Sequence, residues 1–156
     1  MKLSEHGLNE IRKHEGFGPN VYRDVAGLKT VGYGHLLTAS DRAMGRFKYG
    51  VSEEGATRLL AEDVAWAERV VNNLVRVQLK QQEFDALTSF VFNIGATAFR
   101  RSTALKRLNR GDKRGAAEAM QWWNKVTING QKVHSQGLVN RRRAEYTLFR
   151  GDKDGA

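Results

Sequence analysis

The sequence contains no cysteine and only one proline, and it has no apolar run of membrane-spanning length. Without cysteine the chain forms neither disulfides nor thiolate metal sites, so its fold does not depend on an oxidising compartment. The first residues, MKLSEHGLNEIRKHEG, lack the apolar region of a secretory signal peptide. We therefore expect a protein that is synthesised in the cytoplasm without a signal peptide or a transmembrane segment.

Acidic residues are scarce in the last third of the chain. The whole chain has 156 residues, of which 40% are hydrophobic and 28% are charged. This length and composition are typical of one soluble globular domain, which can have two lobes. From Arg100 to Lys153, 14 lysines and arginines stand against 4 acids, so the formal charge of +9 comes from this segment. Such a surface attracts nucleic acid, anionic lipid or bacterial wall polymers, and charge alone does not choose among these and a solvated basic face.

The first third of the sequence predicts a helix and then a β-hairpin. Ser4 is an N-cap candidate, and the helix ends at EGFGP, residues 15–19. Two extended runs, NVYRDV and TVGYGHLL, are joined by a turn at residues 26–28. Because side chains alternate along a strand, we expect the second run to have two faces. One face holds Val31, Tyr33 and His35, and the other holds Thr30, Gly32 and Gly34.

The remaining sequence predicts helices. Ser52 starts a helix whose apolar period continues for six turns, which corresponds to a rod about 30 Å long. Further helices are expected over QQEFDALTSFVFNI, STALKRLNR, KRGAAEAMQWWNKV and LVNRRRAEYTLFR. The predicted fold class is α+β. It has an N-terminal lobe with the hairpin over about 12–55, a connecting helix over about 53–75, and a helical C-terminal lobe over about 76–156 that packs with the first helix.

Glu15 and Asp24 are candidate catalytic residues. Glu15 falls at the C-terminal end of the first helix, where the helix dipole disfavours a negative charge by about 0.3–1 kcal/mol. That position favours the protonated carboxylic acid that a general acid requires. Asp24 ends a strand that enters a turn, where it stays solvated and ionised. Two carboxylates in different environments suit acid–base hydrolysis of a glycosidic bond.

Thr30 is a third candidate, because it shares a predicted strand face with Gly32 and Gly34. Two positions without side chains would let a polymer pass close to the backbone, and the hydroxyl would hold a water against the sugar. An acidic surface hairpin is the plain alternative, since carboxylates at this spacing occur by chance in most proteins.

Four segments extend these observations over nearly the whole chain. They are HEGFGPNVYRD with GLKTVGYGHLLT, LLAEDV, FVFNIGATAFRRSTALKRLN, and GLVNRRRAEYTLFRGD. Together they resemble the phage-type lysozymes, the endolysins of glycoside hydrolase family 24. The resemblance implies a lysozyme-like two-lobed fold and hydrolysis, with inversion, of the β-1,4 bond between N-acetylmuramic acid and N-acetylglucosamine in peptidoglycan. This reaction would lyse the host cell and release phage.

The resemblance also implies roles for individual residues. Glu15 is the proton donor, Asp24 the second carboxylate, and Thr30 the hydroxyl that helps to place the attacking water. Arg141 approaches the catalytic glutamate. Substrate-binding positions are Leu36, Phe92 and Ser102. A structural pair that ties the hairpin lobe to the long helix is formed by His35 and Asp63. The segment AAEAMQWW departs from the family, because it has no asparagine where a further sugar contact is expected.

Other candidate groups have plainer interpretations. Consecutive helical side chains point in different directions, which favours one functional and two solvated arginines over a nucleic-acid patch at residues 141–143. The scattered histidines have no metal-ligand spacing, and no cofactor is implied. A hydrophobic core is favoured over a sugar-stacking platform for most of the aromatic side chains Phe90, Phe92, Phe99, Trp122 and Trp123.

The expected partner is the peptidoglycan glycan strand, bound by a monomer, with no specific nucleic acid. The chain would wait in the host cytoplasm until a separate, holin-type membrane-permeabilising protein admits it to the wall. Two other functions stay open: a lytic transglycosylase that cuts the same bond, and a non-enzymatic cationic protein that acts on membranes or nucleic acid. Asp24 and Thr30 disfavour the first, since that chemistry needs no water-activating base.

Overall fold

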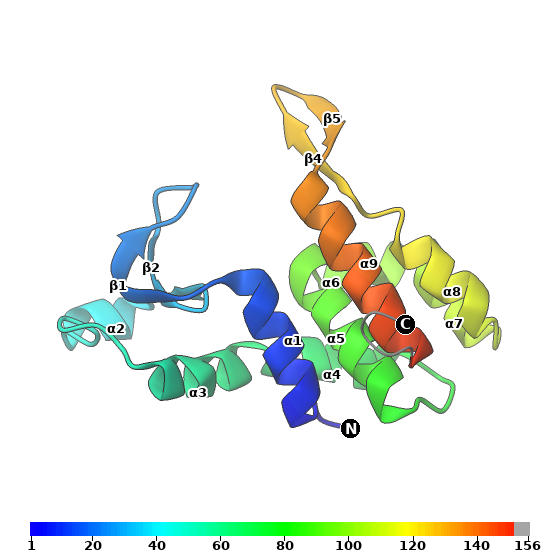
Figure 1. Cartoon of the computed structure of the whole chain (residues 1–156), viewed down its shortest axis with the longest axis horizontal. Helices are drawn as coiled ribbons and strands as arrows, with labels where there is room; N and C mark the ends of the chain where they lie inside the picture. The colour runs from blue at the N-terminus through cyan, green and yellow to red at the C-terminus, as the bar shows by residue number, and fades with distance from the viewer. Residues whose placement is uncertain (152–156) are drawn as a thin grey trace. The chain divides into compact units, whose positions relative to one another are not determined.

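The structure, a computed structural model, describes residues 1–151 and separates them into two units (Figure 1). We call residues 8–65 the hairpin unit, and residues 1–7 together with the chain from residue 66 onward the helical unit. The hairpin unit contains most of α1 (Glu5–Glu15), then β1 (Gly18–Arg23), β2 (Lys29–Gly32), β3 (His35–Leu36), α2 (Ala39–Ala43) and α3 (Glu53–Asp63).

The elements of the helical unit are mainly helices. They are α4 (Ala65–Leu74), α5 (Gln81–Ile94), α6 (Ala96–Arg101), α7 (Thr103–Asn109), α8 (Lys113–Met120), β4 (Lys125–Ile128), β5 (Gln131–His134) and α9 (Gln136–Arg150). Helix α5 packs along α9, and α8 packs on both α7 and α9. The core between them includes Phe84, Phe90, Phe99, Leu108 and Phe149. In the described residues, no helix has the length and apolar character needed to cross a membrane.

Helix α1 begins at the predicted N-cap. The Ser4 hydroxyl accepts a hydrogen bond from the Gly7 backbone N–H at 3.0 Å and donates to the Asp85 carboxylate of α5. A Cβ at position 7 would lie 2.4 Å from Cγ of Asp85, so only glycine allows this close approach. The start of α1 is thus fixed to α5 within the helical unit.

The second predicted strand is divided into β2 and β3. Thr30 pairs with Leu36, and Val31 pairs with His35, because the chain reverses between them. Gly34, at φ +78°, makes the reversal possible without strain. The two strand faces predicted over residues 30–35 are therefore wrong. A tight turn with only two residues between the strands interrupts the alternation, although the sequence retains a strand-like pattern.

The predicted helix over residues 53–75 is divided at Val64. This residue caps α3 with its N–H bonded to the Leu60 carbonyl at 2.9 Å, and α4 begins at Ala65. Its side chain is fully buried. The apolar period therefore continues across the interruption, which explains why the sequence pattern does not show it.

The prediction of an entirely helical C-terminal lobe is wrong at residues 125–134. Here β4 and β5 form an antiparallel hairpin around Asn129 and Gly130, which have φ angles of +50° and +79°. An Asn-Gly pair between alternating strands is a strong hairpin signal. The predicted helix over KRGAAEAMQWWNKV ends instead at Met120, and helix α6 occupies a stretch between two predicted helices where no helix was predicted.

Candidate active site

Glu15 is the last residue of α1, and its carboxylate lies beside the β2–β3 turn. Its Oε2 atom is 3.5 Å from the position that a Cβ would occupy at Gly34. Glu15 is half-buried, whereas Gly34 is exposed. Because Gly34 has no side chain, the turn between β2 and β3 approaches the carboxylate with backbone atoms alone at this position.

Gly32 does not lie on an open strand face, as its position in the sequence predicted. It is buried, and a Cβ there would lie 2.9 Å from the Cβ of Ala56 in α3. The glycine thus lets β2 pack closely on α3, and it clears no path for a polymer. Of the two glycines predicted to open the strand face, only Gly34 lies beside a candidate catalytic group.

Asp24 is held by the turn between β1 and β2. Its Oδ1 accepts hydrogen bonds from the backbone N–H groups of Ala26 and Leu28, both at 2.9 Å. Its own N–H donates to the Leu28 carbonyl at 2.9 Å. Among the described residues, none donates a hydrogen bond to Oδ2, and the residue is half-buried. One carboxylate oxygen therefore fixes the geometry, and the other remains available as a proton acceptor.

Thr30 is joined to the same turn. Its hydroxyl donates to the Leu28 carbonyl at 2.9 Å, which leaves the oxygen lone pairs as acceptors. The residue is only 2% exposed, whereas its strand partner Leu36 is 49% exposed. The turn thus supports two of the three candidate catalytic residues through one backbone unit.

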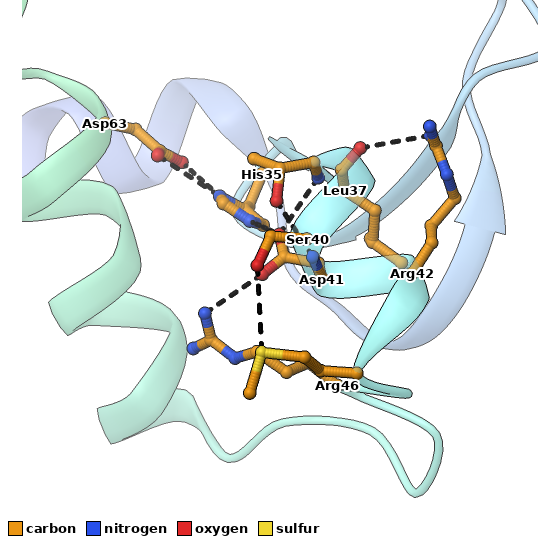
Figure 2. A network of polar contacts seen from close by, with 9 residues as sticks. His35, Leu37, Ser40, Asp41, Arg42, Arg46 and Asp63 are labelled. Atoms are coloured by element: carbon orange, nitrogen blue, oxygen red, sulfur yellow. Dashed lines mark hydrogen bonds and ion pairs between the residues drawn. The ribbon is translucent and has the colours of Figure 1, made fainter.

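His35 ties the small sheet to two helices, as Figure 2 shows. Its Nδ1 lies 2.9 Å from Oδ2 of Asp63 in α3, and its Nε2 lies 2.9 Å from Oδ2 of Asp41 in α2. Both ring nitrogens therefore face carboxylates, which favours the doubly protonated imidazolium. Burial lowers the pKa of His35, but hydrogen bonds and charge from Asp41 and Asp63 outweigh it, so the pKa is raised. The predicted His35–Asp63 pair is present.

Asp41 is a member of this network that the sequence analysis missed. It also accepts from the Thr38 N–H at 3.0 Å and from Arg46 at 2.9 Å. The hydrogen bond from the Thr38 backbone N–H has the largest effect on the Asp41 pKa, and the hydrogen bond to His35 has the next largest. Together they lower this pKa to about 2. Burial instead raises the pKa of Asp63. The sequence signal was the capping box of α2, with Thr38 at the N-cap and Asp41 three residues later.

Comparison with known proteins identifies the family. A profile described as phage lysozyme matches residues 12–145. This chain belongs to the phage lysozyme family. An endolysin of Acyrthosiphon pisum secondary endosymbiont phage 1 is 40% identical over 149 residues, 96% of this chain and 98% of the relative. An endolysin of Salmonella phage P22 is 35% identical, with the same coverage of 96% and 98%.

Solved structures agree with this assignment. The endolysin from Escherichia coli O157:H7 phage FAHEc1 matches with a TM-score of 0.84 and 42% identity, over 96% of this chain and 93% of that one. The muramidase domain of SpmX from Asticaccaulis excentricus matches with a TM-score of 0.85 and 38% identity, over 95% and 97%. The predicted lysozyme-like α+β fold is thus confirmed, and this member of the phage lysozyme family is a hydrolase of the lysozyme type.

Two predicted sugar-binding residues of this phage lysozyme-family chain lie in the helical unit. Phe92 is half-buried, with its ring centroid 6.0 Å from that of Trp66. Ser102 is 3% exposed and caps α7: its hydroxyl donates to the Phe99 carbonyl at 2.7 Å and accepts from the Leu105 N–H at 3.1 Å. Ser102 therefore caps a helix in this structure, whereas Phe92 is half-buried and packs against the core of the helical unit.

The arginine run in α9 differs from its sequence interpretation. Arg141 and Arg142 are both buried, and only Arg143 is exposed, so the prediction of two solvated arginines is wrong. The Glu145 carboxylate compensates the two buried charges: its Oε1 lies 2.7 Å from Nε of Arg142, and its Oε2 lies 3.2 Å from Nε of Arg141. Burial lowers the pKa of Arg142. The approach of Arg141 to Glu15 stays a prediction.

The aromatic residues divide into two groups. Phe90 and Phe99 are fully buried, which confirms the core interpretation for these two. Trp122 and Trp123 are instead 56% and 36% exposed, so the core interpretation is wrong for them. They follow the end of α8 and precede β4, and therefore lie at the base of the second hairpin.

Proposed function

We propose that this member of the phage lysozyme family is an endolysin that hydrolyses the β-1,4 bond between N-acetylmuramic acid and N-acetylglucosamine in peptidoglycan, with inversion. The observation that carries the proposal is the pair of carboxylates in the hairpin unit. Glu15 ends a helix beside the open turn at Gly34, whereas Asp24 is fixed by its own turn through one oxygen. Two carboxylates on separate elements with separate surroundings can divide the acid and base roles.

In this mechanism Glu15 protonates the oxygen of the leaving sugar as the bond breaks. Asp24 uses its second oxygen to take a proton from a water that attacks the opposite face of the sugar ring. Thr30 accepts a hydrogen bond from the same water, because its own proton is donated to the Leu28 carbonyl. Inversion requires about 6.5–9.5 Å between the two carboxyl groups, which leaves room for that water.

The biological setting follows from the substrate. Peptidoglycan lies outside the cytoplasmic membrane, so we propose that a separate membrane-permeabilising protein of the holin type admits the enzyme to the wall. There the enzyme acts as a monomer on the glycan strand and lyses the host. Its formal charge of +9 favours the anionic wall, an attraction that weakens as ionic strength rises.

The test is digestion of purified peptidoglycan with mass analysis of the released fragments. Wild type should release fragments with new reducing ends, and Glu15→Gln should release none at comparable enzyme concentration. Glu5→Gln is the matched control, because Glu5 is an exposed glutamate at the other end of α1. It should cleave at the wild-type rate.

Other products would point to other functions. Fragments that end in 1,6-anhydro-muramic acid would identify a lytic transglycosylase and remove the base role from Asp24. Lysis of cells by both wild type and Glu15→Gln, without cleavage of the glycan, would identify a cationic protein that acts without catalysis.

A further inference from the structure

The β4–β5 hairpin has two chemically different faces. Side chains of a strand alternate between its faces, and directly paired residues share one face. The register of the two strands therefore assigns one face to Val126, Ile128, Gln131 and Val133. The other face carries Lys125, Thr127, Lys132 and His134. The ribbon is apolar on one side and basic on the other.

The apolar face is exposed to solvent. All eight strand residues are exposed, and in the described chain the two strands form a sheet of their own (Figure 1). Val126, Ile128 and Val133 are 38%, 54% and 42% exposed. An isolated two-stranded hairpin is only marginally stable in water. Clustered apolar side chains on such a ribbon are typical of an interaction site.

The base of the hairpin is anchored to the helical unit. The Trp123 ring makes an edge contact with Phe90 at 6.3 Å between centroids, and its carbonyl accepts from Arg142 at 3.4 Å. Trp122 stays exposed beneath the Arg107 guanidinium, which lies 4.9 Å from the ring centroid. The hairpin therefore extends from a fixed base, with an exposed tryptophan beside it.

Charge selects the kind of partner. The sequence contains no aspartate or glutamate between Glu118 and Glu145, although this stretch carries Lys125, Lys132 and the three arginines at 141–143. A partner of this segment is therefore anionic. Aliphatic side chains form no hydrogen bonds with sugar hydroxyls, whereas they pack favourably among the acyl chains of lipids. Tryptophan prefers the boundary between headgroups and acyl chains.

We propose that the β4–β5 hairpin, together with Trp122, binds the surface of an anionic phospholipid bilayer. The apolar face enters the boundary between headgroups and acyl chains, and the lysines lie within a Debye length of the lipid phosphates. This contact would hold the enzyme at the membrane next to its wall substrate. It is separate from glycan cleavage, because it uses none of the residues assigned to the reaction.

Sedimentation with lipid vesicles tests the proposal. The vesicles contain phosphatidylethanolamine and phosphatidylglycerol at about 3:1, or phosphatidylcholine alone. Wild type should bind the anionic vesicles at least about tenfold more tightly, and added salt should weaken this binding. Lys125→Gln/Lys132→Gln should weaken it about 25-fold, since each cation near such a surface contributes a factor of about five.

The apolar face is tested separately. Val126→Ser/Ile128→Ser should weaken binding to the anionic vesicles at least about tenfold. The matched control is Met44→Ser/Tyr49→Ser, which removes two exposed apolar side chains of the hairpin unit, 74% and 91% exposed, and should leave vesicle binding unchanged. All these variants should cleave purified peptidoglycan at the wild-type rate, which also shows that they fold.

Three results would overturn the proposal. The first is equal vesicle binding by wild type and Val126→Ser/Ile128→Ser, and the second is equal binding to phosphatidylcholine and anionic vesicles. The third is a loss of peptidoglycan cleavage in the hairpin variants while their vesicle binding is unchanged, which would show that the hairpin binds the glycan. Glu15→Gln separates the two proposals, because it should lose cleavage and keep vesicle binding.

Discussion

Asp24 and Thr30 are joined through one peptide unit: the Asp24 N–H and the Thr30 hydroxyl both donate to the carbonyl of Leu28. The Leu28 N–H in turn donates to the Asp24 carboxylate. A change at one of the two residues is therefore transmitted to the position of the other by two hydrogen bonds. This connection gives the proposed water-activating pair a common support in the β1–β2 turn.

Replacing Asp24 by asparagine should separate the role of this residue in stabilising the β1–β2 turn from its proposed role in catalysis. The asparagine side-chain oxygen can still accept from the Ala26 and Leu28 N–H groups, so we expect the unfolding free energy to change by less than about 1 kcal/mol. Without the basic carboxylate, kcat should fall about 10²–10⁴-fold. The rate of reducing-end formation and a denaturant titration measure the two quantities.

The control for this variant is Asp112→Asn. Asp112 also accepts a backbone N–H, that of Gly115 at 2.8 Å, but it caps α8 in the helical unit. It should show a similarly small change in stability with wild-type kcat. Comparable activity of Asp24→Asn and Asp112→Asn would remove Asp24 from the mechanism.

Thr30 can be tested with two substitutions of different chemistry. Thr30→Val keeps the shape but removes the hydroxyl that donates to Leu28, so we expect a loss of about 1 kcal/mol in unfolding free energy and a clear loss of kcat. Thr30→Ser keeps the hydroxyl and should retain more of the kcat than Thr30→Val. If both variants lose the same activity, packing rather than the hydroxyl explains the requirement for threonine.

Gly34→Ala tests the space beside Glu15. Alanine at φ +78° is strained by about 1–2 kcal/mol, and its methyl group would contact the Glu15 carboxylate. We expect lower thermal stability together with lower kcat. Gly45→Ala is matched, because Gly45 has φ +65° and no atom within 4 Å of its Cβ position. It should lose similar stability and keep its activity, and equal activities in the two variants would contradict the prediction.

The three candidate catalytic residues were accessible from the sequence because their surroundings are local. Glu15 was identified by its position at the end of a predicted helix, and Asp24 and Thr30 flank one short turn. Their individual roles came from the family resemblance. Contacts between distant segments were less accessible: Gly32 is explained by its contact with Ala56, and the buried Arg142 lies over the ring of Phe90.

Two further differences have specific physical causes. The Asn-Gly turn at residues 129–130 was present in the sequence, but the preceding apolar residues of KRGAAEAMQWW favoured a longer helix. Asp41 was missed because its importance lies in its contact with His35, across the turn between β3 and α2. A periodic pattern identifies buried faces, whereas it does not identify the partner of a buried charge.

The His35 network predicts a pH dependence of stability. Since folding raises the His35 pKa above 6.5, its contribution is fully present below that pH and is lost as the pH rises through the folded pKa. Asp41, with a pKa of about 2, contributes above 3.8 and loses its contribution as the pH falls toward 2. The Tm difference between wild type and His35→Gln should therefore be largest near pH 5–6 and shrink above pH 6.5.

His134→Gln is the control for this experiment, because His134 is an exposed residue of β5. Its Tm should follow that of wild type across the same pH range. Asp41→Asn should also reduce the change of Tm between pH 5 and pH 9 that His35 causes, because it removes one of the two carboxylates that stabilise the His35 imidazolium. A constant difference between wild type and His35→Gln from pH 5 to 9 would contradict a charged His35 in the folded state.

Glu145→Gln should be among the most destabilising single changes in the helical unit. Glu145 is buried between Arg141 and Arg142, and the neutral amide would remove the negative charge that lies against both buried guanidinium groups. Breaking a buried pair in this way costs about 3–5 kcal/mol. Glu118→Gln, an exposed glutamate of α8, should change the unfolding free energy by less than about 0.5 kcal/mol. Urea titrations of the two variants would decide, and equal midpoints would show that Glu145 does not compensate the buried arginines.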